Sequence, residues 1–444
     1  MAGTDAPGRG AFAPRPVLRL AVLAAAALAA GCGGSSQVAP QPAATAGGSC
    51  GEVRPTLGCR EIVVGGRPYR YSLLRPRGGP GAEAALVDLG GPGRALFGGD
   101  DLLAFARAWP GGETLLFLEE PWVTEPTSPA CASALSAFYR ALRRGATAGS
   151  GSRLVSTCGL GTPGRWGWTA ARYGEVVDAI VAAENLRLVG VVGTSYGAVR
   201  ARGVIDRPSL RWLVLDSPAP PASTGAAYLS ARRDAALAAL ARSCPRCAGS
   251  AGAARLAERA AATLRAHPVE LATRTPPVVG TDVPAALVGL AHLPPGPRAR
   301  LAAGLERPRA AAAAIGALSD STLLRFGEYD ISPGTLAYLD EICRVYGPWS
   351  SGVRDGARDV VGRFLVELHS PCRYLDPAPA APAPAAPRAV CIARGGEDFV
   401  TPAGFAAAWQ TLLPQARRIE VPGALHGTPE LARACRLVVA RAAG

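Results

Sequence analysis

The chain has 444 residues, more than one ordinary hydrophobic core needs, so we expect a main domain that carries a sizeable insertion. Hydrophobic residues make up 49% and charged residues 18%, a balance that excludes a largely disordered chain. The net charge is +13 and every cationic side chain is an arginine, but these arginines are scattered among alanines without basic runs, which argues against a nucleic-acid-binding surface.

The N-terminus has the pattern of an exported protein. Arginines precede an apolar run over residues 20–30, which is shorter than the roughly 20 residues that span a bilayer and fits a signal peptide over 1–31. Gly31-Cys32 resembles the lipobox of bacterial lipoproteins, in which Cys32 becomes the lipidated first residue. Ala29 stands where leucine is usual, so simple secretion with cleavage nearby is the alternative. We expect a protein outside the cell, held at the outer face of a bacterial membrane only through Cys32, with a flexible tether over 32–49.

The even number of cysteines that remains after Cys32 supports export. Setting Cys32 aside leaves ten cysteines, which predict five disulfides: Cys50, Cys59, Cys131, Cys158, Cys244, Cys247, Cys343, Cys372, Cys391 and Cys435. Pairing neighbours in sequence is the simplest scheme, although spacing alone does not fix the connectivity. Cys244 and Cys247 have the spacing of a redox motif but lie in an alanine-rich helical stretch, so we expect a structural bridge there. No histidine clusters with cysteine at ligand spacing, so we expect no metal site.

Residues 50–219 are predicted to form the first part of an α/β core. Two strands, 61–64 and 69–75, are expected to form a hairpin, and the apolar runs 84–89 and 114–118 are expected to be buried strands on either side of a helix over 100–109. A helix over 169–185 capped by Thr169, a strand over 188–192, a helix from 198 and a strand over 212–215 follow.

The second half of the chain changes character and then returns to the first pattern. Residues 220–375 predict a helical lid, 376–387 a proline-alanine linker, and 388–444 the rest of the core, with strands at 389–393 and 418–421 and helices at 403–412 and 429–441. This order predicts a mostly parallel central sheet with helices on both faces and a helical lid inserted after the sixth strand. The lid would lie over the carboxyl ends of the strands, where open α/β sheets bind their ligands.

One motif points to nucleophilic chemistry. Residues 193–197 read G-x-S-x-G between a predicted strand and a predicted helix, as a nucleophile elbow requires, so Ser195 is the candidate nucleophile. A serine needs a base, and His426, which follows the last predicted strand, is the candidate because the other three histidines lie in the lid region. Asp398 follows the preceding strand and is the expected carboxylate partner of His426, with its neighbour Glu397 as the alternative.

The same chemistry needs donors for a developing oxyanion. The backbone N–H of Tyr196, next to the nucleophile, is one candidate. The glycine-rich stretch 89–93 follows a predicted strand, and from it we expect the Gly91 N–H to be the second donor, with Gly90 as the alternative.

These motifs, taken together, resemble the proline iminopeptidase and tripeptidyl aminopeptidase group of secreted bacterial serine hydrolases. The resemblance covers roughly 60–220 and 388–444 and rests on residues 90–93, 193–197, 398–402 and 426–427, together with Cys131 and the run 212–216. It implies the α/β-hydrolase fold, in which the serine, the acid and the histidine follow in that order. It also implies cleavage of short peptides from a free N-terminus through an acyl-enzyme, under a helical lid and without a cofactor.

Two departures bear on the substrate. The family stretch Asp-x-Arg-Gly-x-Gly-x-Ser is replaced here at 119–126 by a stretch that lacks the arginine and the glycines. Many members carry an acidic residue two places after a lid cysteine, where it could bind the substrate amino group, but Cys343 is followed by Arg344-Val345. Glu341, or Asp340 beside it, is the candidate to take that part.

Three hypotheses follow for the substrate or ligand that this site binds. The first is a small peptide with a free N-terminus, and the second is an ester or lactone turned over by the same serine, histidine and aspartate. The third, from another class, is an inactive lipoprotein that binds a ligand beneath its lid. The oligomeric state is left open by the sequence.

Overall fold

The computed structural model describes residues 50, 53–75, 81–97, 100–123, 125–325, 331–349, 357–378, 385 and 387–443. These residues all fall within one compact unit, Pro40–Gly444. The predicted signal peptide, Cys32 and the tether lie outside the described residues, as does much of the predicted linker. None of the described helices is long and apolar enough to cross a membrane.

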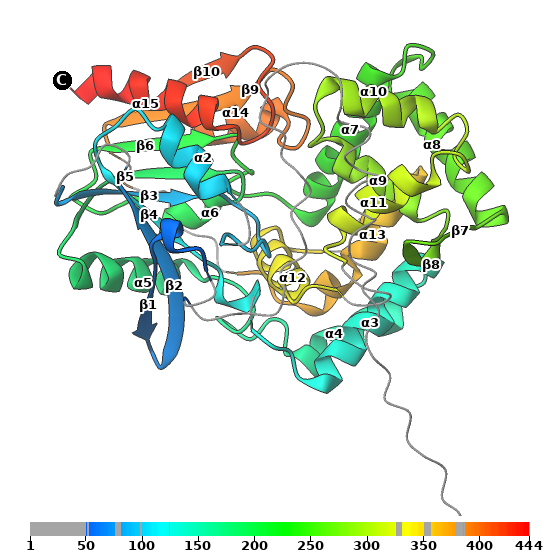
Figure 1. Ribbon diagram of the computed structural model, residues 1–444, viewed down its shortest axis with the longest axis horizontal. Coiled ribbons are helices and arrows are strands. Elements are labelled where there is room, and N and C mark those ends of the chain that lie inside the picture. The colour runs from blue at the N-terminus through cyan, green and yellow to red at the C-terminus, as the bar shows by residue number, and fades with distance from the viewer. Residues whose placement is uncertain are drawn as a thin grey trace, which may run out of the picture. The chain divides into compact units, whose positions relative to one another are not determined.

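An eight-stranded sheet forms the centre of the core (Figure 1). The strand order is β1-β2-β4-β3-β5-β6-β9-β10. The hairpin β1-β2 is antiparallel and β2 pairs antiparallel with β4, whereas every other pair is parallel. The strands are β1 (Cys59–Val64), β2 (Arg67–Leu74), β3 (Glu83–Asp88), β4 (Thr114–Leu118), β5 (Arg187–Thr194), β6 (Trp212–Asp216), β9 (Ala389–Gly395) and β10 (Arg417–Val421).

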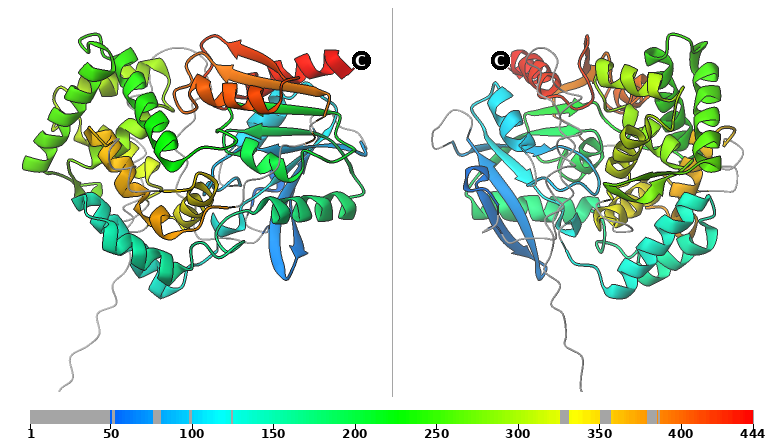
Figure 2. Two further views of the ribbon diagram at one scale, coloured as in Figure 1. Left: turned by 180° about the vertical axis from the view of Figure 1, so that it is seen from behind. Right: turned by 45° about the vertical axis from the view of Figure 1, so that its right-hand side comes forward.

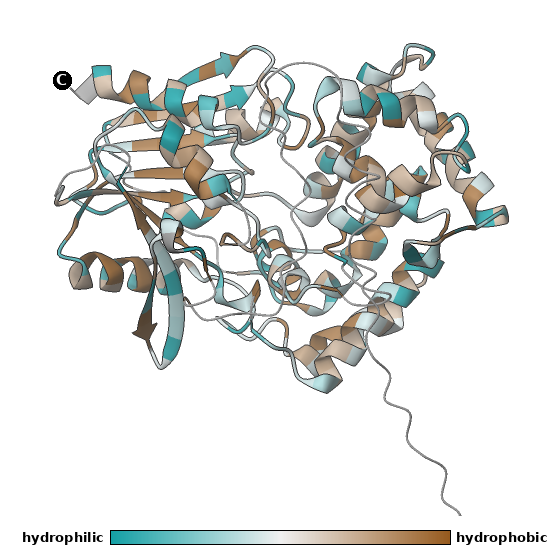
Figure 3. Ribbon diagram, in the orientation of Figure 1, coloured by the Kyte–Doolittle hydropathy of each residue, from teal (hydrophilic) through white to brown (hydrophobic). Residues whose placement is uncertain are grey.

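Helices cover both faces of this sheet, which explains why its central strands are apolar along most of their length (Figure 3). On one face α2 (Asp101–Ala108) and α15 (Pro429–Ala443) pack on side chains of β3, β5, β6 and β9. On the other face α5 (Ala170–Ala183) and α14 (Ala403–Leu412) pack on the alternate side chains of the same strands. A short helix, α6 (Gly197–Arg200), continues into a 3-10 turn, Ala201–Gly203, on this second face.

Helix α5 shows how the sequence specifies one of these layers. The Thr169 hydroxyl accepts a hydrogen bond from the Arg172 N–H at 3.1 Å, so the predicted cap is confirmed. Tyr173, Val176, Val177 and Ile180 are buried at the spacing of a single helix face. That face packs on the sheet.

A block of helices separates β6 from β9 (Figures 1 and 2). It contains α7 (Gly225–Ser243), α8 (Gly249–Ala266), α9 (Asp282–Leu290), α10 (Pro295–Gly304), α11 (Ala312–Thr322), α12 (Gly334–Val345), α13 (Val360–Leu368) and a 3-10 helix, Ser370–Tyr374. Helices α3 (Pro129–Arg144) and α4 (Ala148–Cys158) precede α5 in the chain. Their apolar side chains belong to the same hydrophobic cluster as those of the helical block.

Parts of this block differ from the sequence-based expectation of helices and loops alone. Strands β7 (Val269–Leu271) and β8 (Arg274–Val278) form a separate antiparallel pair. Two prolines in β8 mask its strand pattern in the sequence, because proline normally disfavours a strand assignment. Helices α3 and α4 also had no sequence-based prediction.

The strand order, the antiparallel β2 and a G-x-S-x-G turn directly after β5 define the α/β-hydrolase fold. The predicted fold class is therefore confirmed, with the helical block inserted after the sixth strand. Two further 3-10 helices, Pro55–Leu57 and Pro121–Val123, lie before β1 and after β4.

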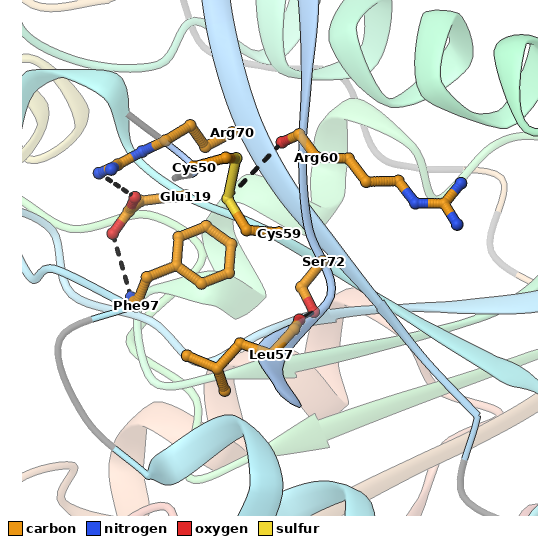
Figure 4. The surroundings of a disulfide bond; sticks show 8 residues. All are labelled: Cys50, Leu57, Cys59, Arg60, Arg70, Ser72, Phe97 and Glu119. Atoms are coloured by element: carbon orange, nitrogen blue, oxygen red, sulfur yellow. Dashed lines mark hydrogen bonds and ion pairs between the residues drawn. A yellow bond between two sulfur atoms is a disulfide. The ribbon is translucent and has the colours of Figure 1, made fainter. Parts of the chain in front are cut away.

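Five disulfides join cysteines that are neighbours in sequence, which is the simplest of the expected schemes: Cys50–Cys59, Cys131–Cys158, Cys244–Cys247, Cys343–Cys372 and Cys391–Cys435. The last of these ties α15 to β9, and Cys343–Cys372 ties α12 to the turn after α13. Figure 4 shows the first bridge beside β2, close to the pair formed by Arg70 and Glu119. Such crosslinks restrict the unfolded chain.

Gly190 provides a test of how tightly β5 packs. A Cβ atom at this position would lie 2.0 Å from ring carbons of Trp212, so Gly190→Ala should lower the free energy of unfolding by about 1–3 kcal/mol. At Gly149 in α4 a Cβ meets no atom within 4 Å, so Gly149→Ala should be neutral or stabilising by up to about 1 kcal/mol. Urea unfolding with the disulfides intact measures both, and a loss at Gly149 equal to that at Gly190 would contradict this packing.

Candidate active site

Ser195 lies at the sharp turn between β5 and α6. Its φ is +54°, an unfavourable value for a residue with a side chain, and the turn is held because the Ser195 N–H donates to the Asp216 carbonyl at 2.9 Å. A Cβ at Gly193 would lie 2.7 Å from the Ala198 Cα, and one at Gly197 would lie 2.5 Å from the Asp88 carbonyl oxygen. The two glycines of the motif are therefore required by close backbone packing around the serine.

Asp398 and His426 meet beyond the ends of β9 and β10. His426 Nδ1 lies 3.2 Å from Asp398 Oδ2, and the aspartate side chain is fully buried while the histidine is 11% exposed. Asp398 Oδ1 accepts the N–H groups of Val400 (2.8 Å) and Thr401 (3.0 Å). Burial opposes ionisation of this carboxyl, but the His426 imidazole and the bonds from Thr401 outweigh it and lower the pKa of Asp398 well below its usual value. The carboxylate is thus ionised beside the imidazole.

Glu397, the alternative acid, points elsewhere. Its carboxylate pairs with Arg242 at 3.3 Å and with Arg298 at 3.1 Å. Of the two neighbouring acids, it is Asp398 that faces His426.

Thr401 is a member of this cluster that sequence reasoning missed. Its hydroxyl donates to Asp398 Oδ2 at 2.5 Å and lies 3.3 Å from His426 Nδ1. An aspartate that accepts backbone N–H groups two and three residues later is a common turn pattern, so the spacing of Asp398 and Thr401 was the available signal.

The loop that carries His426 lies against the serine turn. The Gly427 N–H donates to the Ser217 hydroxyl at 3.3 Å, and a Cβ at Gly427 would lie 2.9 Å from Thr194 Cγ2. Among the described residues no hydrogen bond joins the Ser195 hydroxyl to His426, whose Nδ1 faces Asp398. The structure thus brings together the segments of all three candidate residues and pairs two of the side chains directly.

The glycine loop after β3 touches the same turn. A Cβ at Gly90 would lie 3.0 Å from the Ser195 Cβ. The Gly90 N–H donates to Asp88 Oδ1 at 2.8 Å, which removes this group as an oxyanion donor. Across the described part of the chain, the N–H groups of Gly91 and Tyr196 have no acceptor, so both are free to bind a developing oxyanion.

Glu341, the candidate for binding a substrate amine, is already occupied. Its side chain is 1% exposed, and its Oε2 accepts from Arg200 Nε at 3.0 Å while Oε1 accepts from the Trp168 N–H at 3.1 Å. Asp340 accepts from the Gly161 N–H at 2.6 Å. Both acids therefore hold the lid to the core.

A second histidine adjoins the site from the lid. His292 follows α9, and its ring lies perpendicular to that of His426 with centroids 5.7 Å apart. His369, by contrast, stacks on Trp349 and lies 2.9 Å from the Tyr338 hydroxyl inside the lid, as expected of a structural histidine. In the ranges that the structure describes, no three His, Cys, Asp or Glu side chains converge in a way that could hold a metal ion.

Comparisons with known proteins give only distant likenesses. No family model matches the chain, and no curated protein matches it. Among solved structures, it is similar to a hydrolase from Pseudomonas aeruginosa (16% identity, 86% of this chain and 98% of that chain covered, TM-score 0.37). It is also similar to a proline iminopeptidase-related protein from Thermus thermophilus (14% identity, 86% of this chain and 98% of that chain covered, TM-score 0.37). A third similar structure is a meta-cleavage product hydrolase from Pseudomonas fluorescens (13% identity, 87% of this chain and 98% of that chain covered, TM-score 0.40).

A buried carboxyl beneath the site, Asp216, gives a pH-dependent prediction. It is 1% exposed, and its Oδ2 accepts from the Thr194 hydroxyl at 3.5 Å. Burial, reinforced by the negative charge of Asp398, raises the pKa of Asp216 to about 8. Folded protein therefore keeps this proton at neutral pH, whereas an unfolded aspartate loses it near pH 4.

Because the folded state binds the extra proton, the free energy of unfolding should fall as the pH rises from about 4 to about 8. Asp216→Asn removes this titration, so the variant should lose less stability between pH 5 and pH 8 than wild type does, by more than about 1 kcal/mol. Thermal unfolding at both pH values measures the difference, with the exposed Asp376→Asn as the control. Parallel pH curves for wild type and Asp216→Asn would show that Asp216 is not protonated in the folded protein.

Proposed function

We propose that this protein is a serine hydrolase that forms an acyl-enzyme at Ser195, with His426 as base and Asp398 as the carboxylate partner of the histidine. The observation that carries the proposal is the strained serine turn after β5 beside the paired aspartate and histidine that follow β9 and β10. A serine raised on such a turn is the nucleophile position of this fold.

Each residue has a defined part in the reaction. His426 takes the proton of the Ser195 hydroxyl as the oxygen attacks the substrate carbonyl, and the oxyanion accepts from the N–H groups of Gly91 and Tyr196. The imidazolium then gives its proton to the leaving group, and a water molecule releases the acyl group by the same steps. Asp398 stays ionised and stabilises the imidazolium, in keeping with its lowered pKa.

Short peptides with a free N-terminus are the first substrate class, and they are supported by the motif resemblance around residues 90–93, 193–197, 398–402 and 426–427. Five disulfides support action in an oxidising compartment outside the cell, to which Cys32 would tether the protein by a lipid.

Esters or lactones are the second substrate class, and one contact favours them. The Glu341 carboxylate is bound to Arg200 and buried, so it is not free to bind a substrate ammonium group. An acyl substrate without a charged N-terminus would not need such a group.

A substrate panel with wild type and Ser195→Ala tests the proposal. Wild type should be labelled by a fluorophosphonate probe and should turn over chromogenic acyl esters or unblocked di- and tripeptide amides, whereas Ser195→Ala should lose labelling and at least about 10⁴-fold in kcat while remaining folded by circular dichroism. Release from unblocked but not from N-acetylated peptide amides identifies an aminopeptidase, and turnover of esters alone identifies an esterase. Absence of labelling in folded wild type would instead favour the inactive ligand-binding protein.

The neighbouring acids offer a matched pair of variants. Asp398→Asn should lower kcat by about 10⁴-fold, because the amide neither stabilises the imidazolium nor holds its tautomer. Glu397→Gln should retain most of the activity, because Glu397 pairs with Arg242 and Arg298 rather than with His426. The reverse ranking of the two kcat values would transfer the acid role to Glu397.

A further inference from the structure

A single buried arginine lies among three carboxylates behind the serine turn. Arg200 is the last residue of α6, and its side chain is 4% exposed. Its guanidinium bonds to Glu120 Oε1 at 2.5 Å, to Glu341 Oε2 at 3.0 Å and to Asp88 Oδ1 at 3.4 Å. These acids come from the ends of β3 and β4 and from lid helix α12, so one cation joins three separate parts of the fold.

Two of these carboxylates also hold the glycine loop. Asp88 Oδ1 accepts from the Gly90 N–H at 2.8 Å, and Glu120 Oε2 accepts from the Gly93 N–H at 2.7 Å. A Cβ at Gly91 would lie 2.9 Å from Glu120 Oε1, so the loop rests directly on that carboxylate. The loop is therefore fixed on both sides of Gly91, whose own N–H stays free.

The electrostatics make Arg200 necessary to this arrangement. Burial raises the pKa of Glu120 and raises that of Glu341 to about 8, whereas the Arg200 guanidinium opposes both shifts because it stabilises the ionised carboxylates. Burial opposes the charge of Arg200 as well, but the three carboxylates outweigh it and raise the pKa of the guanidinium. Removing this cation would leave the carboxylates buried without compensation, a state that proteins avoid by protonation or rearrangement.

The same cluster also contacts Tyr196, which carries the other candidate donor, and the lid. The Arg200 guanidinium carbon lies 5.3 Å from the centre of the Tyr196 ring, a cation–π distance. At the far end of the loop, a Cβ at Gly93 would lie 2.0 Å from the Gly334 carbonyl oxygen at the start of α12, so loop and helix pack backbone to backbone. Helix α12 is thus fixed to the loop at Gly334 and to Arg200 at Glu341.

We propose that Arg200 is a positioning residue that sets the geometry of the oxyanion hole by holding Asp88 and Glu120 against the loop around Gly91. This inference rests on the proposed function, because the proposed function assigns the oxyanion hole to the N–H groups of Gly91 and Tyr196.

The outer part of the loop has a separate support. Glu119 Oε1 accepts from the N–H groups of Leu96 (2.9 Å) and Phe97 (3.1 Å), and the same carboxylate pairs with Arg70 (Figure 4). Changes at Arg200 should therefore disturb the loop near Gly91 without releasing its outer end.

Arg200→Lys is the test, because an ammonium keeps the charge but cannot bond to three carboxylates with the planar fork of a guanidinium. The substrate is whichever ester or peptide amide wild type turns over, and active sites are counted by fluorophosphonate titration so that unfolded molecules do not enter kcat. We expect kcat per active site to fall about 10- to 10³-fold with KM changed less than about threefold, because the hole acts on the transition state. Affinity for a trifluoromethyl ketone of the same acyl group should fall by a similar factor.

Arg207→Lys is the matched control. Arg207 also makes several bonds, to Asp178 and to the carbonyls of Gly174 and Gly203, but it does not contact the loop, so its kcat per active site should stay within about twofold of wild type. If Arg200→Lys does not fold, Glu120→Gln replaces it, because the single amide oxygen can serve Arg200 or the Gly93 N–H but not both, and the same fall in kcat is expected.

Per-site kcat and inhibitor affinity equal to those of the control would overturn the inference and leave the proposed function standing. Failure of wild type to react with the fluorophosphonate would instead overturn the proposed function itself.

Discussion

The backbone turn at Ser195 is the constraint on which the rest of the site depends. A residue with a side chain is held there at positive φ, a conformation that costs about 1–3 kcal/mol and persists only where its surroundings fix it. Here the surroundings are the Asp216 carbonyl, which accepts the Ser195 N–H, and two glycines that allow α6 to pack against β5 and β3. The parallel sheet brings the ends of β3, β9 and β10 to the same edge, so the glycine loop and the aspartate–histidine pair reach this turn without long connections.

Buried charge is the second organising feature. Asp398 is kept ionised by an imidazole, a hydroxyl and two backbone N–H groups, whereas Asp216, at the end of β6, has too few partners and keeps its proton. Around Arg200 three acidic side chains share one cation, and burial raises the pKa of two of them, Glu120 and Glu341, as it does that of Asp216. The local environment therefore differs at each position. Asp398 is ionised beside the histidine, Asp216 is neutral beside the serine turn, and the acids near the glycine loop are paired with Arg200.

Much of the core could be predicted from sequence because its signals are local. The strands carry continuous apolar runs, Thr169 caps its helix, and the G-x-S-x-G turn is readable because strand and helix flank it. Cysteines that are neighbours in sequence also proved to be partners in every described disulfide.

What sequence reasoning missed depends on contacts between distant segments. Arg200 meets Glu120 and Glu341, which lie 80 and 141 residues away in the chain, so no local pattern marks the cluster. For the same reason Glu341 looked available to a substrate when it is bound within the protein. The strand β8 was hidden by its prolines, and Thr401 was overlooked although its spacing from Asp398 is that of a common turn.

The most direct test of the central claim is a crystal structure of the protein after reaction with a fluorophosphonate. The account predicts phosphorus bonded to Ser195 Oγ, a phosphoryl oxygen about 3 Å from the backbone nitrogens of both Gly91 and Tyr196, and His426 between the adduct and Asp398. A phosphoryl oxygen that points away from both nitrogens, or a histidine ring other than that of residue 426 beside the adduct, would contradict it.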